Sequence, residues 1–333
     1  MAASGSDRDA INEAPGPDEG PDKPTELGRR SWWAAVRRAA KEFQEDNLTD
    51  WAAALTYYGV LSIFPGLLVL VSVLGLLGQD VLEPLLENLT EIAPGPVRDI
   101  LTAAAENLQA GQRRAGLVAA IGLVVALWSA SGYVGAFMRA SNAVYDVPEG
   151  RPIWKTLPIR IGITVVTGIL LVVSAVIVVL SGRVAEQVGE ALGFGGGAVT
   201  IWNIVKWPVL LVLVSLMFAL LYWASPNARP GGFHWVSPGG LLAVVLWIAA
   251  SALFAVYVAS FASYNETYGT LGGVIVFLIW LWISNIAILL GLEFDAELER
   301  QRAIAAGHPP DEEPYLRLRD TRKIRKGGDT DLR

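Results

Sequence analysis

The side chains with the greatest capacity for chemistry are polar groups inside or at the ends of long apolar segments, and there are few of them. Glu293 ends the apolar run Leu289-Leu290-Gly291-Leu292, and Asn285 lies in the middle of the same segment. An ionisable group in a membrane is costly unless it is paired or used. Glu293 is therefore a candidate for binding a cation or for pairing with Arg139 or Arg160, although it can also simply mark the membrane boundary. For Asn285 we expect a hydrogen bond to a neighbouring helix, with a place on a transport pathway as the alternative.

Two further features indicate places where the backbone bends or turns. Pro65 follows Ser62 within an apolar segment, and a proline there removes a backbone donor and kinks the helix. Kinked or broken helices are where transporters expose unpaired backbone groups to a substrate. The segment Tyr264-Asn265-Glu266-Thr267-Tyr268-Gly269-Thr270 links two apolar segments and suits either a gate or a sharp corner.

Residues for enzymatic chemistry are scarce. The chain has no cysteine and two histidines, His234 and His308, neither of which has a partner at the spacing of a zinc site. It contains no Gly-x-Ser-x-Gly nucleophile motif and no Cys/His pair. We therefore expect no catalytic residue, no metal site and no cofactor, and hence no enzyme.

Six apolar segments dominate the sequence and must position these polar groups. They cover residues 57–78, 115–137, 158–181, 204–223, 238–260 and 271–292. A helix needs about 20 apolar residues to cross a bilayer, whereas core helices of soluble proteins are shorter and carry a polar stripe. With 53% hydrophobic residues, and with several of its twelve tryptophans beside these segments, the chain is predicted to be an all-α polytopic membrane protein with six transmembrane helices.

The remaining segments divide into tails, an interfacial helix and a cap. Residues 1–30 are rich in Pro, Gly, Asp and Glu and are predicted to be a disordered cytoplasmic tail. Residues 31–45 mix Trp, Val and Phe with Arg and Lys at helical spacing, which indicates an amphipathic helix on the membrane surface or, alternatively, a helix packed on the protein. Within the transmembrane domain, 46–298, we expect residues 79–114 to form an extracytoplasmic cap of short amphipathic helices. Residues 299–333 are predicted to be a basic, disordered cytoplasmic tail.

The distribution of Lys and Arg predicts the orientation, because these residues are enriched in cytoplasmic loops. The N-terminal flank, the loop after the second segment and the C-terminal flank carry most of them, whereas the opposite loops carry few. Both termini are therefore expected to face the cytoplasm, which agrees with an even number of spans.

Several ordered motifs cover most of residues 45–298. They are Ala53-Ala54-Leu55-Thr56-Tyr57-Tyr58, Leu61-Ser62-Ile63-Phe64-Pro65, Leu127-Trp128-Ser129-Ala130-Ser131, Asn142-Ala143-Val144-Tyr145, Leu221-Tyr222, Pro226-Asn227, Pro238-Gly239, Tyr264 to Gly272, Trp280 and Leu289 to Glu293. Together they resemble the YihY/BrkB family of membrane proteins. Leu292 is a mild departure, because family members often have Ala there.

The resemblance implies a six-helix protein of the bacterial plasma (inner) membrane. Some members of the family have been called ribonuclease BN, and others are linked to serum resistance. The nuclease label does not suit this sequence, because RNA cleavage needs a metal or acid–base cluster and a basic or aromatic groove. The basic residues here lie in the tails and at the membrane flanks.

The leading hypothesis is a transporter-like or lipid-handling membrane protein, with the lipid bilayer as its environment, a lipid or small ion as its substrate and no nucleic-acid partner. The residues that we expect on a pathway or gate are Tyr57, Ser62, Pro65, Trp128, Asn142, Tyr264, Asn265, Tyr268 and Glu293. The alternative is an envelope scaffold that binds other proteins through the cap or the tails. A membrane-associated ribonuclease is a remote third interpretation. The sequence leaves the substrate, the energy source and the oligomeric state open.

Overall fold

The computed structural model describes residues 21, 26–76, 113–179, 196–230, 237–260 and 265–324. In this part of the chain every regular element is a helix, and the one pairing of extended residues is an isolated bridge between Ala228 and Leu318. The helices are α2 (Arg29–Glu45), α3 (Leu48–Leu76), α6 (Arg113–Val144), α7 (Ile153–Val179), α9 (Gly196–Ala224), α10 (Pro238–Ser260) and α11 (Asn265–Ala305). The predicted all-α class is confirmed for these residues.

Five of these helices contain stretches long and apolar enough to cross a membrane. The stretches are Leu123–Val144, Ile153–Val178, Val199–Ala224, Pro238–Val258 and Gly272–Ala305, and they overlap the second to sixth predicted spans. α3 covers most of the predicted first span, but residues 77 and 78 lie outside the described part of the chain. Six spans therefore stay a prediction, whereas five are found.

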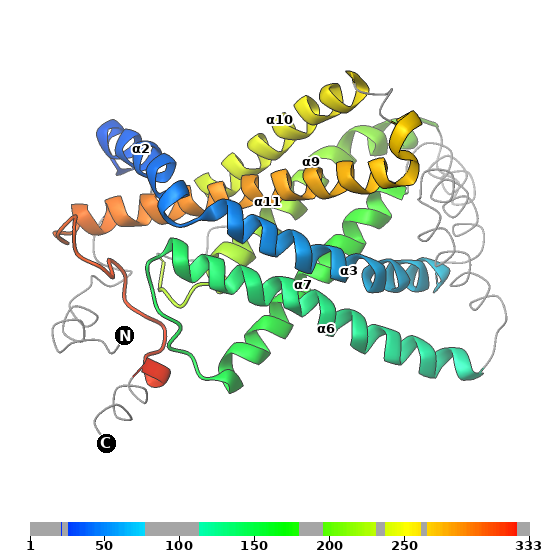
Figure 1. Ribbon diagram of the computed structural model, residues 1–333, viewed down its shortest axis with the longest axis horizontal. Coiled ribbons are helices and arrows are strands. Elements are labelled where there is room, and N and C mark those ends of the chain that lie inside the picture. The colour runs from blue at the N-terminus through cyan, green and yellow to red at the C-terminus, as the bar shows by residue number, and fades with distance from the viewer. Residues whose placement is uncertain are drawn as a thin grey trace.

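The helices draw together near α2 and spread apart toward the opposite end of the molecule (Figure 1). α3 lies along α6 and α10 lies along α11, while the ends of α6 and α10 far from α2 are widely separated. We call the converging end the α2 end; it comprises α2, the first turns of α3, the link 145–152 and residues 284–324. The largest fully buried side chains lie at or near this end: Tyr315, Phe137, Leu48, Leu55, Leu289, Leu292, Glu293, Asn227 and Asn285.

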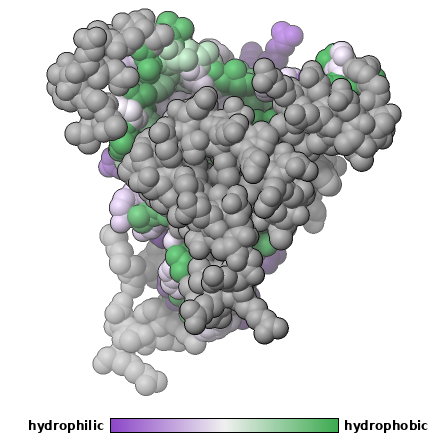
Figure 2. All heavy atoms as spheres, turned by 90° about the vertical axis from the view of Figure 1, so that its right-hand side faces the viewer, coloured by the Kyte–Doolittle hydropathy of each residue, from purple (hydrophilic) through white to green (hydrophobic). Residues whose placement is uncertain are grey.

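Away from the α2 end, large apolar side chains point outward. Ile169 on α7, Ile201 on α9 and Leu253 on α10 are each more than half exposed. Figure 2 views the molecule from the end opposite α2, and hydrophobic residues are visible on the periphery of the described helices. Such an apolar exterior is costly in water and favourable in lipid.

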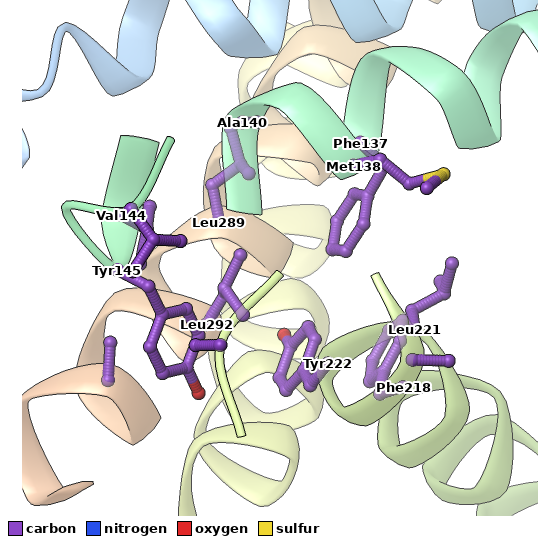
Figure 3. Packing of buried hydrophobic residues seen from close by; sticks show 14 of the residues in the cluster. Phe137, Met138, Ala140, Val144, Tyr145, Phe218, Leu221, Tyr222, Leu289 and Leu292 are labelled. Atoms are coloured by element: carbon purple, nitrogen blue, oxygen red, sulfur yellow. The ribbon is translucent and has the colours of Figure 1, made fainter. Parts of the chain in front are cut away.

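A stack of aromatic rings joins α6 and α9 (Figure 3). Tyr222 stacks on Phe137 with ring centroids 6.2 Å apart and on Phe218 at 6.0 Å. Its hydroxyl donates a 2.6 Å hydrogen bond to the carbonyl oxygen of Ile288 on α11. A buried Tyr thus places its ring in the apolar core and satisfies its polar end on a third helix.

α10 and α11 approach each other most closely where two glycines meet. A methyl group built on Gly291 would overlap the carbonyl oxygen of Gly239 and lie 2.7 Å from Cβ of Ala243. The backbone N–H of Gly239, at the start of α10, donates a 2.7 Å hydrogen bond to Oδ1 of Asp295. A carboxylate is well suited to the free N–H groups of a helix start, so this contact fixes the register of the two helices.

α2 packs on α11 through a small apolar cluster. Ala35 is fully buried, and the cluster also contains Leu27, Phe294 and Leu298. On the opposite side of the helix Trp33 remains 64% exposed. One face of α2 therefore contacts protein, as in the second of the two interpretations offered by the sequence, and the other face is left open.

The segment after α11 differs from the sequence-based expectation. We expected disorder from residue 299, yet α11 continues to Ala305, and Tyr315, Leu316 and Leu318 are buried in the main core. These apolar residues are separated by charged ones, so composition alone suggests a polar tail. Their burial against the bundle supplies the apolar contacts that a disordered segment lacks. Residues 325–333, the tail 1–20 and residues 79–112 of the predicted cap lie outside the described residues.

Gly291→Ala should loosen the contact between α10 and α11. The added methyl group has no space beside Gly239 and Ala243, and overpacking of this kind costs about 1–3 kcal/mol. Thermal unfolding of the detergent-solubilised protein, followed by tryptophan fluorescence, would show a lower Tm. Gly168→Ala is the control, because a methyl group there meets no atom within 4 Å. Equal Tm values for the two variants would contradict the close approach.

Candidate functional site

The last turns of α11 carry charged side chains that are buried. Glu293 is 1% exposed, Glu297 2% and Arg300 2%. Their spacing places them on one face of the helix, because residues four and seven apart lie above one another. Charged residues are almost never so buried unless they are paired. This face of α11 is therefore the candidate functional site.

Arg300 contacts acidic groups from three parts of the chain. Its guanidinium lies 2.9 Å from Asp146 in the α6–α7 link, 3.3 Å from Glu297 and 3.1 Å from Glu313 in the C-terminal segment. The guanidinium also stacks 4.4 Å from the ring centroid of buried Tyr315. Arg300 thereby joins α11 to the α6–α7 link and to residues 313–315.

Arg38 makes the corresponding connection to α2. It lies 3.0 Å from Glu42 on its own helix and 3.2 Å from Glu297 on α11. Glu297 therefore lies between two guanidinium groups, one from α2 and one from its own helix. Networks of this kind are geometrically specific, and removing one member leaves another buried charge uncompensated.

Glu293 has a different neighbour, the carboxyl group of Asp46 in the short link between α2 and α3. The two carboxyls are close enough for a hydrogen-bonding interaction. One oxygen of Glu293, Oε2, is buried and has no hydrogen-bond partner in the described structure. Two carboxylates in contact repel, so such a pair is stable when the two groups share a proton.

The surroundings of Asp46 move its titration toward neutral pH. Burial, followed by the negative charge of Glu42, raises the pKa of Asp46 to about 6, although the interaction with Glu293 opposes the rise. Burial likewise raises the pKa of Asp146 to about 7, with Glu313 adding to the effect, although Arg300 opposes it from 2.9 Å. Protonation at the α2 end therefore changes close to neutral pH.

A second polar cluster joins the α6–α7 link to the C-terminal segment. Asn142 donates a 3.0 Å hydrogen bond to Glu149 and accepts one of 2.7 Å from the backbone N–H of Asn227. Asn227 in turn bonds the backbone of Asp320, whose carboxylate lies 2.6 Å from Lys155. These bonds satisfy Asn142 within the fold and account for its burial without a pathway.

The predicted pathway residues on α3 and α6 lie at the outer surface or bond their own helix. Tyr57 is 62% exposed and Trp128 is 66% exposed. The hydroxyl of Ser62 donates a 2.7 Å hydrogen bond to the carbonyl oxygen of Tyr58, one turn earlier. The structure does not bring Tyr57, Ser62 or Trp128 together with Glu293.

The other predicted positions are described only in part. Pro65 lies within α3, which is helical on both sides of it, and Asn265 and Tyr268 lie in the first turns of α11. The side chains of these three residues, and Tyr264 as a whole, lie outside the described part of the structure.

Asn285 connects three helices, as expected for a polar side chain within a span. Its amide accepts a 2.9 Å hydrogen bond from the hydroxyl of Tyr133 on α6 and donates one of 3.1 Å to the hydroxyl of Thr56 on α3. Glu293, in contrast, has neither Arg139 nor Arg160 as its partner among the described ion pairs. The physical reason is that both arginines lie on α6 and α7, whereas Glu293 faces the α2–α3 link.

Asp46 and Arg300 are central to the site, but neither stands out in the sequence as a candidate. The sequence did contain one indication of Arg300. The spacing of Glu293, Glu297 and Arg300 places them on one face of a helix that continues the last apolar segment. Asp46 carries no comparable signal, since only the fold brings it to α11. Within the described residues, no group of three or more His, Asp or Glu side chains is arranged to hold a metal ion.

Comparison with known proteins identifies the relatives of this fold. A family model described as virulence factor BrkB matches residues 39–315, which include α3, α11 and the buried segment after it. The chain belongs to the BrkB family. It is thus a multi-pass membrane protein of a bacterial membrane family, and the resemblance seen in the sequence is confirmed.

Individual BrkB relatives cover most of the chain at moderate identity. YfkH of Bacillus subtilis, whose name describes it as ribonuclease-like, is 30% identical over 79% of this chain and 93% of its own length. A UPF0761 membrane protein of Alkalilimnicola ehrlichii is 28% identical over 80% of this chain, which spans 60% of that relative. A UPF0761 membrane protein of Chromohalobacter salexigens is 29% identical over 84% of this chain and 68% of its own length. No solved structure matches the chain.

Arg300→Met should destabilise the α2 end of this BrkB chain. The variant leaves Glu297 buried with one guanidinium fewer and frees residues 313–315, at a cost of about 3 kcal/mol. We expect a lower Tm and faster proteolysis after residue 305. Lys41→Met is the control, since Lys41 forms an exposed pair with Glu45. Unchanged protection of residues 306–324 would show that Arg300 does not hold them.

Asp46→Asn should flatten part of the pH dependence of stability. Folded Asp46 retains its proton to about pH 6, whereas an unfolded Asp loses it near pH 4, so the wild-type free energy of unfolding falls as pH rises between these values. The variant should remove about 1 kcal/mol of this fall, a figure reduced for the partial exposure of Asp46. Asp146 should produce a remaining fall up to about pH 7.

Chemical denaturation at a series of pH values measures this effect. Asp50→Asn, at an exposed position in the first turn of α3, is the control and should keep the wild-type slope. If Asp46→Asn also kept that slope, the carboxyl pair would not hold the proton.

Proposed function

We propose that this protein is a transporter-like or lipid-handling membrane protein whose α2 end opens and closes with the protonation of the Asp46–Glu293 pair. The observation that carries the proposal is the contact between two carboxyl groups, one of them buried in the helix that continues the last span. An ionisable residue in such a position is expensive to maintain and typical of proton or ion pathways.

Loss of a proton from Asp46 would change the contact between the two carboxyls. It places a negative charge beside Glu293, with the negative charge of Glu42 close to both groups. Asp46 lies in a two-residue link, where Asn47 adopts a left-handed conformation with φ 52°. A movement of this link shifts α2 and α3 relative to α11, so the charge of the pair is coupled to the packing of three helices.

The arrangement of the helices supports a conformational role. Among the described residues, the largest buried side chains lie at or near the α2 end, while the other ends of α6 and α10 diverge (Figure 1). Reversible contacts at the α2 end would allow these helices to rearrange. We propose that the α2 end faces the cytoplasm of the bacterial inner membrane, in agreement with the Lys and Arg distribution.

The proposal includes no enzymatic activity. The name of YfkH suggests a ribonuclease, but RNA cleavage needs groups that position metal ions or transfer protons at the phosphate. Among the buried acids of α11, Glu297 is paired with Arg38 and Arg300, and Asp295 accepts a hydrogen bond from Gly239. Degradation of RNA by purified, nuclease-free protein would contradict this part of the proposal.

Reconstitution in liposomes tests the proposed function. Wild-type protein should increase the flux of a fluorescent phospholipid, of protons or of a small ion above that of empty liposomes, and the flux should rise as pH increases through about 6. Glu293→Gln mimics the protonated acid, and we expect lower flux without that pH dependence.

The matched control is Glu312→Gln, which removes an exposed carboxylate after α11. It should retain wild-type flux. If folded wild-type protein gave no flux of any probe, transport would be excluded and the scaffold alternative favoured. Wild-type flux and pH dependence in Glu293→Gln would show that the pair does not control the α2 end.

A further inference from the structure

Two arginines lie close together within membrane-spanning helices and have no acidic partner among the described residues. Arg139 is on α6 and Arg160 is on α7, inside the stretches Leu123–Val144 and Ile153–Val178. They are near enough for the charge of one to act on the other. Among the described residues neither forms an ion pair, in contrast to Arg38, Arg151 and Arg300.

Arg160 is held in a fixed position against α6. One of its terminal nitrogens donates a 2.6 Å hydrogen bond to the hydroxyl of Ser131, and its guanidinium lies 5.9 Å from the ring of Trp128. The absence of a side chain at Gly135 makes this position accessible, since a Cβ there would lie 3.1–3.3 Å from the Arg160 side chain. Its Nε is buried and has no hydrogen-bond partner.

Arg139 completes the site from the next turn of α6. Its side chain is exposed, and its guanidinium lies 5.9 Å from the ring centroid of Tyr58 on α3. Ser131, Gly135 and Arg139 recur at intervals of four residues, which places them on one side of α6. Two guanidinium groups therefore share one stretch of α6, flanked by aromatic rings.

An uncompensated pair of positive charges in a membrane segment requires a negative partner. Each guanidinium offers several N–H donors in a planar fork that matches the oxygens of a phosphate. The described protein supplies the hydroxyl of Ser131 and aromatic faces here, but no carboxylate. An anion from outside the described residues would supply the missing partner.

The position of the arginines along their helices corresponds to the headgroup layer. At about 1.5 Å per residue, Arg139 lies about 8 Å from the end of α6 at Val144, and Arg160 about 10 Å from the start of α7 at Ile153. The headgroup and interfacial regions occupy about 5–8 Å on each side of the hydrocarbon core. Long Arg side chains can therefore reach a lipid phosphate at this level.

The surface beside the arginines is suited to an acyl chain. Val124, Val125 and Trp128 lie on the preceding turns of α6 and are each at least half exposed. They extend from the arginines toward the middle of the span, in the direction that an acyl chain takes from its headgroup. A free phosphate ion would use the two charges but would gain nothing from these apolar residues.

We propose that Arg139 and Arg160 bind the phosphate of an anionic phospholipid, whose acyl chain lies along the exposed face of α6 at Val124, Val125 and Trp128. Ser131 positions the guanidinium of Arg160, and Gly135 makes room for it. Lipid binding at this site does not depend on the transport proposed above, because a bound lipid can be either cargo or a fixed part of the structure.

Native mass spectrometry of the purified protein with phosphatidylglycerol tests this site. Arg139→Gln combined with Arg160→Gln should reduce the retained phosphatidylglycerol at least fivefold. Arg37→Gln, which removes an exposed arginine from α2, should retain as much as the wild type. Gly135→Leu should also reduce retention, because it displaces Arg160 without removing a charge.

A second double variant protects the test against a loss of folding. Arg139→Lys with Arg160→Lys keeps both charges but not the planar fork, and it should retain an intermediate amount of lipid at wild-type Tm. Equal retention by the wild type and the glutamine variant would overturn the proposal. Displacement of the lipid by millimolar inorganic phosphate would also overturn it, since the site would then recognise a soluble anion.

Retention is measured without transport, so its outcome is separable from that of the liposome experiment. Loss of lipid from the arginine variants with unchanged pH-dependent flux would support the binding site and leave the carboxyl pair as the controlling element. Wild-type lipid retention by the double glutamine variant would contradict the lipid site, and absence of flux through the wild-type protein would contradict the proposed function.

Discussion

The α2 end of this protein depends on one buried guanidinium, that of Arg300. It contacts carboxylates from the α6–α7 link, from its own helix and from the C-terminal segment, while stacking on Tyr315. No single contact of this group defines the fold. Their combination does, because the three acids come from the α6–α7 link, α11 and the C-terminal segment, which Arg300 thereby holds together. A lysine offers one point charge and could not satisfy all of these directions at once.

Polar and small residues perform similar roles deeper in the bundle. Lipid tails are as apolar as leucine, so burial of apolar area does not draw spans together as it does in water. The helices are joined instead by the bonds of Asn285 to Tyr133 and Thr56 and by the contact between Gly239 and Gly291. Trp247 and Trp280 add hydrogen bonds to Ser284 and Ser251. Close backbone contacts and hydrogen bonds, and not the hydrophobic effect, therefore determine which helices pair.

Hydropathy alone predicted most of the fold. Length and composition identified five spans that the structure contains, and the sixth remains a prediction for α3. The functional site was harder to predict, because it forms where the apolar pattern ends. Glu293 stood out as an acid at the end of a span, whereas Asp46 and Arg300 resembled ordinary charges of flanking segments. Their proximity results from helix packing over more than two hundred residues of sequence, which no local pattern contains.

The same limit applies to the arginines and to the C-terminal segment. Arg139 follows the second predicted span and Arg160 lies near the start of the third, and these positions in the sequence do not indicate that the two residues lie near each other. Tyr315, Leu316 and Leu318 lie among charged residues, and three apolar residues are too few to show a helical or strand periodicity. Tertiary contact decides both cases, as it does for Asn142, whose partners come from two distant segments.

The burial of residues 314–320 also constrains how the molecule is made. These residues follow every membrane helix in the chain, yet they occupy the core beside Tyr145 and Asn227. During synthesis the helices enter the membrane one after another while this segment is still absent. The polar core at the α2 end can therefore close only after translation has passed residue 320.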